Sequence, residues 1–235
     1  MSTEGQIPNL EQPPGPGKII KVLGGVAMLS GLLVVLTYQL TLPTIMENRR
    51  IAREKAVLSV IPGATSFIEF MLSEHEGLIR VKADGSTKVP EGMVDPVYAG
   101  YDNAGQFMGV ALEAGAQGYQ DVVRTLYGYS PPCECIVGMT VLESKETPGL
   151  GDKVETDPDF IANFKALEAK LSGDKKALAN PIETVKHGTK KHPWQIDAIS
   201  GSTVTSNAIG KGLNNSAQRL LPLLRYHLDE FEIEQ

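Results

Sequence analysis

A long apolar run near the N-terminus is the strongest pattern in the chain. Residues 22–36 read VLGGVAMLSGLLVVL, and the uncharged stretch continues to Met46. This is longer than the roughly 20 residues that cross a hydrocarbon core of about 30 Å. Core helices of soluble proteins are rarely uncharged for so long. A cleaved signal peptide would have a shorter apolar region and an A-x-A-like site, which does not follow Leu36. The pattern therefore predicts a retained transmembrane anchor over residues 18–46.

The segments on either side of this anchor are polar. Residues 1–17 are rich in Pro and Gly, which is typical of a disordered tail. Residues 47–60, ENRRIAREKAVLSV, combine mixed charge with good helix formers and predict a juxtamembrane helix. More basic residues follow the anchor than precede it: Arg49, Arg50, Arg53 and Lys55 against Lys18 and Lys21. Taken alone, the positive-inside rule favours a cytoplasmic C-terminal domain.

The rest of the chain mixes the periodicities of strands and helices. Short alternations predict strands within Phe67–Lys88 and at Cys135–Glu143, and a hairpin over Val97–Glu113 around an Asp102–Gly105 turn. Apolar residues at helical spacing predict a helix over Asp157–Leu171 and a long amphipathic helix over Ser206–Glu230, kinked or broken near Pro222. We therefore expect a single mixed α/β (α+β) extramembrane domain over residues 47–235.

Composition narrows the possible functions. The chain is 42% hydrophobic and 21% charged with a formal net charge of −6, which is too apolar for a disordered protein and gives no basic stripe for nucleic acid. Cys133 and Cys135 are too few for a disulfide framework or a four-ligand zinc site. Separated by one residue, they are poorly placed for an unstrained bridge, so we expect ordinary thiols, with a labile redox or metal-binding pair as the alternative. We expect no metal site.

The segment that carries candidate chemistry is DAISGSTVTS, residues 197–206. It places several hydroxyls and Gly201 where a helical pattern begins. Ser and Thr are preferred helix N-caps, so the residues alone are consistent with a capping region. A phosphate at the same position would meet free backbone N–H groups and the positive end of the helix dipole. Both interpretations remain open at this point.

This segment resembles the flavinylation motif of the FMN-binding domain family, D-x-x-[ST]-G-A-T-x-[ST]. A second segment, ETPGLG at Glu146–Gly151, is similar to a block characteristic of the G subunit of Rnf complexes. The same block is found in the C subunit of the sodium-pumping NADH:quinone reductase. The order of the parts also fits: one anchor, ETPGLG midway, and the flavinylation motif before a last helix.

The resemblance implies that FMN is joined through a phosphoester to Thr203, with Asp197, Ser200, Gly201, Ser202, Val204 and Thr205 forming the attachment segment. Ser202 departs from the family's alanine, so Ser202 and Thr205 are rival attachment sites in principle. Gly63-Ala64-Thr65 also spells GAT but lacks the surrounding motif.

Other segments are candidates for contact with the flavin ring. We expect Glu146 and Thr147 to bond its polar atoms, Leu150 to cover it and Gly151 to let the backbone approach. Gly118-Tyr119 corresponds to a GY loop near the flavin in the family, although a plain hairpin tyrosine is an alternative. From its residues alone, without the resemblance, ETPGLG would be interpreted as a surface turn. His187 and His192 are expected to be solvated, and Trp194 to lie in the core or under the flavin loop.

The resemblance thus implies an electron-transfer subunit of an Rnf-type complex rather than a stand-alone enzyme, with no catalytic side chains of its own. Its partners would be other subunits, a flavin transferase and membrane lipid. It would lie in the inner membrane, with residues 1–17 in the cytoplasm and the flavin domain outside, against the charge count. The alternatives are the C subunit named above and a membrane-anchored, flavin-free binding or sensor protein.

Overall fold

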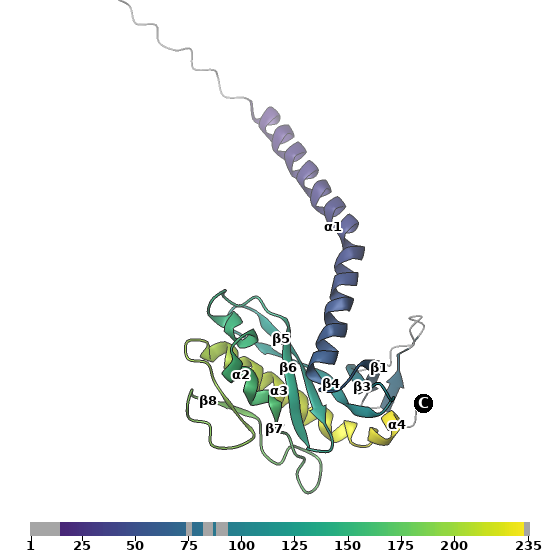
Figure 1. The fold of residues 1–235 in the computed structure, drawn as a ribbon. Coiled ribbons are helices and arrows are strands. Elements are labelled where there is room, and N and C mark those ends of the chain that lie inside the picture. The colour runs from purple at the N-terminus through teal and green to yellow at the C-terminus, as the bar shows by residue number, and fades with distance from the viewer. Residues whose placement is uncertain (1–14, 74–76, 82–86, 88–93, 233–235) are drawn as a thin grey trace, which may run out of the picture. The chain divides into compact units, whose positions relative to one another are not determined.

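The computed structural model describes residues 15–73, 77–81, 87 and 94–232 (Figure 1). The chain divides into two compact units, residues 1–50 and 51–235. Helix α1 (Pro16–Val60) is 45 residues long, and its most apolar 18-residue window has a mean hydropathy of 2.4. Among the described residues it is long and apolar enough to cross a membrane. Residues 1–14 of the predicted tail lie outside the described residues, and Pro16 already starts the helix, a position that proline favours.

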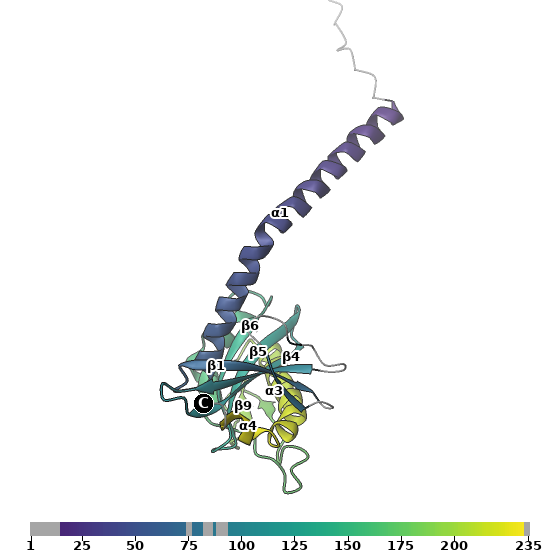
Figure 2. The same ribbon diagram turned by 90° about the vertical axis from the view of Figure 1, so that its right-hand side faces the viewer.

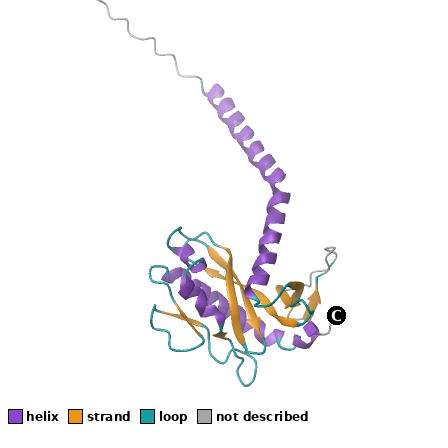
Figure 3. Cartoon of the chain, viewed as in Figure 1, coloured by secondary structure: helices purple, strands orange, loops and turns teal. Residues whose placement is uncertain are grey.

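A seven-stranded sheet forms the centre of the second unit within the described residues (Figure 3). Its strand order is β2-β1-β3-β4-β5-β6-β7, and every neighbouring pair is antiparallel. The strands are β1 (Ser66–Ser73), β2 (Gly77–Arg80), β3 (Val94–Tyr101), β4 (Phe107–Gln117), β5 (Val122–Ser130), β6 (Cys135–Glu143) and β7 (Leu167–Glu168). A small parallel sheet joins β8 (Glu183–Val185) to β9 (Gln195–Asp197).

The predicted hairpin is confirmed as β3 and β4. Its turn is closed by the Asp102 carboxylate, which accepts hydrogen bonds of 2.8 Å from the backbone N–H groups of Ala104 and Gln106. Gly105 supplies the left-handed conformation at φ +77° that the turn requires. The predicted strand at Cys135–Glu143 is confirmed as β6.

Helix α3 (Thr203–Leu224) covers one face of the sheet, as Figures 1 and 2 show. The Tyr127 hydroxyl meets Ser216 Oγ at 3.0 Å, and Arg219 forms a two-pronged ion pair with Asp95 across the same boundary. These contacts fix the position of α3, and therefore of its first turn, relative to β3 and β5.

The opposite face of the sheet packs against the last turns of α1. Val57, Val60 and Ile61 are buried there with Tyr98 and Leu126, among others. A methyl group at Gly128 would collide with the Val60 carbonyl oxygen, and one at Gly138 would come within 2.6 Å of it. The two glycines face each other across β5 and β6, so the pair forms the seat for the end of α1.

The predicted helix over Asp157–Leu171 is wrong beyond its first turn. The Asp157 carboxylate caps α2 (Pro158–Ala162), which is followed by a 3₁₀ turn, η2 (Asn163–Lys165). The buried Asn163 amide bonds the Phe160 carbonyl and the Asp197 backbone instead of continuing a helical face. Leu167 is buried by pairing with Ile136 as part of β7.

The C-terminal helix starts at Thr203 instead of the predicted Ser206, and it has the predicted break slightly later than expected. Pro222 lies inside α3, which ends at Leu224, and α4 (Leu228–Glu232) follows.

The expectation of free thiols is also wrong, because Cys133 and Cys135 form a disulfide. Glu134 between them has the left-handed φ of +48°. This conformation turns the chain between β5 and β6 and brings the two Cα atoms to 5.2 Å, within the usual span of a bridge.

Candidate functional site: a cleft at the start of α3

The segment 197–206 runs from the end of β9 into the first turn of α3. Gly201 has φ +84°, which explains glycine at that position. The Ser206 hydroxyl accepts from the Ile199 backbone N–H at 3.2 Å and donates to the Ser202 carbonyl at 2.9 Å. The loop before the helix is thus held by a side chain from within the first turn. The Ser202 side chain makes no capping bond at the helix start, which disfavours the simple capping interpretation.

The hydroxyls of this segment differ sharply in accessibility. Thr203 is exposed, whereas Ser202 and Thr205 are 4% and 2% exposed. Thr205 Oγ1 donates to Glu146 Oε2 at 2.6 Å. Ser202 Oγ is buried and has no hydrogen-bond partner within the described part of the chain. Thr203 is therefore the hydroxyl of these three that a reagent in solution can reach.

A cleft of about 440 Å³ opens beside this turn. All of the residues that line it come from the segments predicted to contact flavin: Tyr119, Glu146, Thr147, Leu150, Gly151, Gly201, Ser202, Thr203, Val204 and Thr205. We call it the α3 cleft. Its volume is within the usual range for small-molecule sites. Folding thus brings together segments that are far apart along the chain, because the loop after β4 and the turn after β6 both end beside α3.

Glu146 forms the wall between these segments and is only 7% exposed. Its Oε1 accepts 3.0 Å hydrogen bonds from the backbone N–H groups of Tyr119 and Gln120, and its Oε2 accepts from Thr205. Burial raises the pKa of this carboxyl, but the hydrogen bonds from Thr205 and the 119–121 backbone outweigh burial and lower the pKa below its ordinary value. The side chain is ionised at neutral pH.

The rest of ETPGLG forms a tight turn. The Thr147 carbonyl accepts from the backbone N–H groups of Leu150 and Gly151, and Gly149 has φ +78°. The Thr147 hydroxyl accepts from the Gln120 side-chain amide at 2.9 Å. Gln120 is a site residue that sequence reasoning missed, although it directly follows the predicted Gly118-Tyr119 pair.

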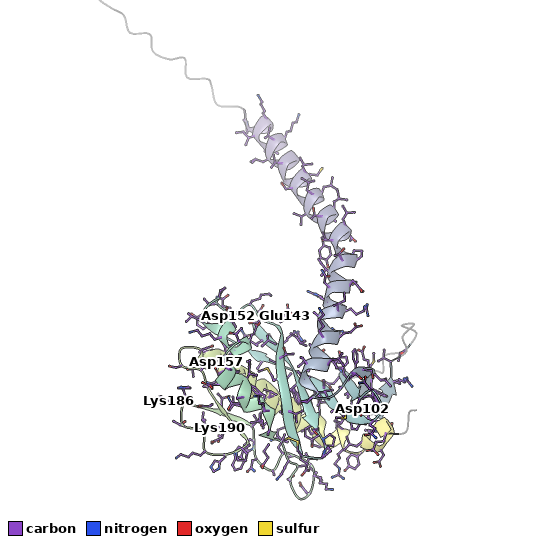
Figure 4. The ribbon with its side chains drawn as sticks, viewed as in Figure 1. Asp102, Glu143, Asp152, Asp157, Lys186 and Lys190 are labelled. Carbon is purple, nitrogen blue, oxygen red and sulfur yellow. A yellow bond between two sulfur atoms is a disulfide. The ribbon has the colours of Figure 1, made fainter. Side chains whose placement is uncertain are left out.

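Asp197 and Ser200 lie elsewhere. They line a second cleft of about 490 Å³ together with His187, Lys153 and Asp157, among others. Asp197 Oδ1 accepts from the Gly188 N–H at 2.7 Å. In Figure 4, Asp157, Lys186 and Lys190 lie on this side of the domain. The structure thus places the aspartate of the attachment motif outside the α3 cleft.

The histidines and the tryptophan are only partly as expected. The His187 side chain is 60% exposed, but its Nδ1 lies 3.0 Å from the Ala198 carbonyl oxygen. His192 stacks on Trp194 with ring centroids 4.5 Å apart. Trp194 is half-buried, so it is not a core residue, and it lines neither cleft. Within the described ranges, no group of His, Cys, Asp and Glu is arranged to hold a metal.

Comparison with known proteins matches the same region. The FMN-binding domain family matches residues 118–218, which include all three segments that line the α3 cleft. The chain is 30% identical over 203 residues to the G subunit of the Na(+)-translocating ferredoxin:NAD(+) oxidoreductase complex of Acetobacterium woodii, covering 86% of this chain and 88% of the relative. The chain belongs to the G-subunit family of FMN-binding proteins.

Two further comparisons are with proteins that are not named as G subunits. The C subunit of the Na(+)-translocating NADH-quinone reductase from Pasteurella multocida is 32% identical over 123 residues, but the match covers 51% of this chain and only 43% of that protein. The crystal structure of NqrC from Shewanella oneidensis has a TM-score of 0.58 and 18% identity, covering 80% of this chain and 100% of that one. That likeness concerns the fold alone.

Proposed function

We propose that this protein is the electron-transfer G subunit of a membrane-bound, ion-translocating oxidoreductase of the Rnf type, and that it carries FMN attached through a phosphoester to Thr203. The observation that carries the proposal is the α3 cleft. Its lining comes entirely from the two motif segments and the GY loop, and among Ser202, Thr203 and Thr205 of the attachment motif Thr203 is the exposed residue.

The start of α3 suits the phosphate end of the cofactor. The first turn of this 22-residue helix has backbone N–H groups without helical partners and the positive end of the helix dipole. Ser202 Oγ, which is buried at the cleft wall without a partner among the described residues, is a ready donor to a phosphate oxygen. An unsatisfied buried hydroxyl is costly, so a ligand that bonds it would remove that cost.

The apolar part of the cleft lining suits a flat aromatic ring. Tyr119, Leu150 and Val204 are 73%, 51% and 53% exposed, and all three line the cleft. Thr147 adds a hydroxyl whose hydrogen remains available while its oxygen accepts from Gln120. We propose that the apolar groups pack on the ring and that Thr147 bonds one of its polar atoms.

When bound, FMN supplies the one- and two-electron redox chemistry of the subunit. The chain's own residues hold and orient the cofactor: α3 fixes the phosphate end, and the 118–121 and 146–151 loops border the ring end. Relatives of this chain are named as subunits of translocating complexes. We therefore propose other subunits as electron donor and acceptor, and a flavin transferase for maturation.

The C subunit of the sodium-pumping NADH:quinone reductase is the second candidate. The matched relative of that type is covered over only 43% of its length, compared with 88% for the G-subunit relative. This difference favours the G subunit.

We further propose that α1 anchors the protein in the inner membrane and that the flavin domain lies outside the cytoplasm. The Cys133–Cys135 disulfide supports this orientation, since such bonds persist in oxidising compartments and are rare in the cytosol. Glu230 is exposed and suits a labelling test. A Glu230→Cys variant should react with an impermeant thiol reagent in cells whose outer membrane has been opened. Labelling only after lysis would reverse the orientation.

The decisive experiment is Thr203→Val in the full chain, expressed with its maturation system. This change removes the accepting hydroxyl but keeps the side-chain shape. We expect fluorescent, denaturation-resistant flavin in the wild type and in a Thr189→Val control, which changes an exposed threonine outside the α3 cleft, and none in the variant. Peptide mass spectrometry should locate FMN on Thr203. Covalent flavin that persists in Thr203→Val would assign the attachment to Ser202 or Thr205, and a colourless wild type would favour a flavin-free protein.

A further inference from the structure

The Glu146 carboxylate is the point at which the three walls of the α3 cleft meet. Its Oε1 holds the loop after β4 through the Tyr119 and Gln120 N–H groups, and its Oε2 holds the first turn of α3 through Thr205. Both oxygens are therefore occupied by the protein itself. A side chain bonded in this way, at 7% exposure, is poorly suited to the ring contact that the sequence motif suggests.

Two glycines of the motifs make room for this carboxylate. A methyl group at Gly118 would lie 2.6 Å from Glu146 Oε1, and one at Gly151 would lie 2.5 Å from Glu146 Cβ. Neither glycine has a left-handed backbone conformation. The close approach of the Glu146 side chain therefore explains why glycine occupies both positions. The GY and GLG segments thus share one physical role, which is to enclose the carboxylate.

We propose that Glu146 is a positioning residue for the flavin: it joins the 118–121 loop to the first turn of α3, and its fixed negative charge lowers the reduction potential of the cofactor beside it. This inference rests on the proposed function, because it takes FMN at Thr203 as given. Thr205 lies two residues beyond Thr203 in the same turn, so the Glu146–Thr205 bond fixes the turn that presents the Thr203 hydroxyl.

The effect on potential follows from the sign of the charge. Reduction adds negative charge to a flavin, and an ionised carboxylate in the wall of the same cleft opposes that change. The interaction is stronger in a partly buried site than in water, since the effective dielectric constant is lower there. Charge near the ring is one of the means by which a protein tunes its flavin.

Three variants of the full chain separate position from charge. In Glu146→Gln the amide oxygen still accepts from the 119–120 backbone, and the amide nitrogen donates to Thr205, so the network survives without its charge. Glu146→Ala removes both. Glu143→Gln removes an equal charge from a side chain that is 53% exposed at the end of β6, and serves as the matched control. The readouts are the rate of FMN attachment, measured as FMN bound per chain over the course of maturation, and the midpoint potential of the attached flavin.

We expect Glu146→Ala to lower the rate of FMN attachment by about tenfold or more, because small misplacements of a reacting group are costly. Glu146→Gln should restore attachment and shift the reduction equilibrium of the flavin towards the reduced form by about tenfold, ~30 mV for a two-electron couple. Glu143→Gln should resemble the wild type in both readouts. Normal attachment in Glu146→Ala, or a wild-type potential in Glu146→Gln, would overturn the proposal.

If Glu146→Gln does not accumulate, two variants of Thr205 test the positioning role instead. Thr205→Ser keeps the donor to Glu146 and should keep attachment at Thr203, whereas Thr205→Val should reduce it. Equal attachment in both variants would contradict the positioning role. Failure of the proposed function itself would be visible separately, as a wild type without FMN on the Thr203 peptide.

Discussion

The substitution Gly118→Ala tests how tightly the α3 cleft is built. The new methyl group would lie 2.6 Å from Glu146 Oε1, 2.8 Å from Val123 Cγ2 and 3.0 Å from the Asp121 carbonyl oxygen. Two of these neighbours are a buried side chain and the backbone, so the carboxylate is the group that must retreat. Its retreat weakens the hydrogen bonds from the 119–120 backbone.

The expected cost combines two contributions. Overpacking costs about 1–3 kcal/mol, and weakening a hydrogen bond to a charged group costs about 1.5–3 kcal/mol. Because the strained contact and the weakened bond partly relieve each other, we expect a loss of about 3 kcal/mol in the free energy of unfolding. In domains of this size each kcal/mol lowers Tm by about 2–4 °C, which predicts a decrease of roughly 6–12 °C.

The assay is thermal unfolding of the detergent-solubilised chain in a Thr203→Val background, so that bound flavin does not contribute to stability. Gly115→Ala is the matched control, since a methyl group at this position of β4 has its nearest neighbour at 3.6 Å, an ordinary contact. The control should unfold near the parent temperature. Equal Tm values for Gly118→Ala and Gly115→Ala would refute the view that Glu146 is enclosed by close-packed glycines.

Three further predictions concern pH, the seat of α1 and the cleft. The lowered pKa of Glu146 means that its carboxylate stabilises the fold above its unfolded pKa of about 4.3, and this stabilisation is lost as the pH falls through the folded value. The Tm difference between wild type and Glu146→Gln should therefore shrink below about pH 4; a constant difference would contradict this. Gly128→Ala should destabilise the domain by about 3 kcal/mol in denaturant unfolding, because its methyl group meets the Val60 carbonyl, and an unchanged midpoint would argue against this seat for α1. Thr147→Val should change the visible spectrum or potential of bound FMN without affecting its attachment, and an unchanged flavin would make ETPGLG a structural turn.

Local sequence patterns were sufficient to predict the secondary-structure elements whose signals lie within a few residues of one another. The apolar run of α1, the Asp102–Gly105 hairpin and the start of α3 each depend on periodicity or on one turn residue. The segment after Asp157 shows where such reasoning fails. Its apolar spacing is helical, yet Leu167 is buried by pairing with Ile136, a partner that no local window contains.

The α3 cleft, too, could be predicted from the sequence only in part. The residues that line it could be named from two short motifs and the GY loop, because those segments were singled out by residue type and spacing. The sequence could not show the contacts that these residues make with one another. The Glu146 carboxylate, expected as a partner for the flavin ring, accepts hydrogen bonds from the Tyr119 and Gln120 N–H groups and from the Thr205 hydroxyl. The motif's aspartate, Asp197, lies instead in the second cleft.

Residue type and spacing thus determine which groups this chain has available: an apolar helix, a threonine at the start of α3, a carboxylate and the glycines beside it. Only the packing of α3 on the sheet decides which hydroxyl of its first turn stays exposed and which carboxylate is buried against that turn. The physical reason is that burial and hydrogen bonding between distant segments depend on positions in space. Those positions are set by contacts such as Tyr127–Ser216 and Asp95–Arg219, which join residues far apart along the chain.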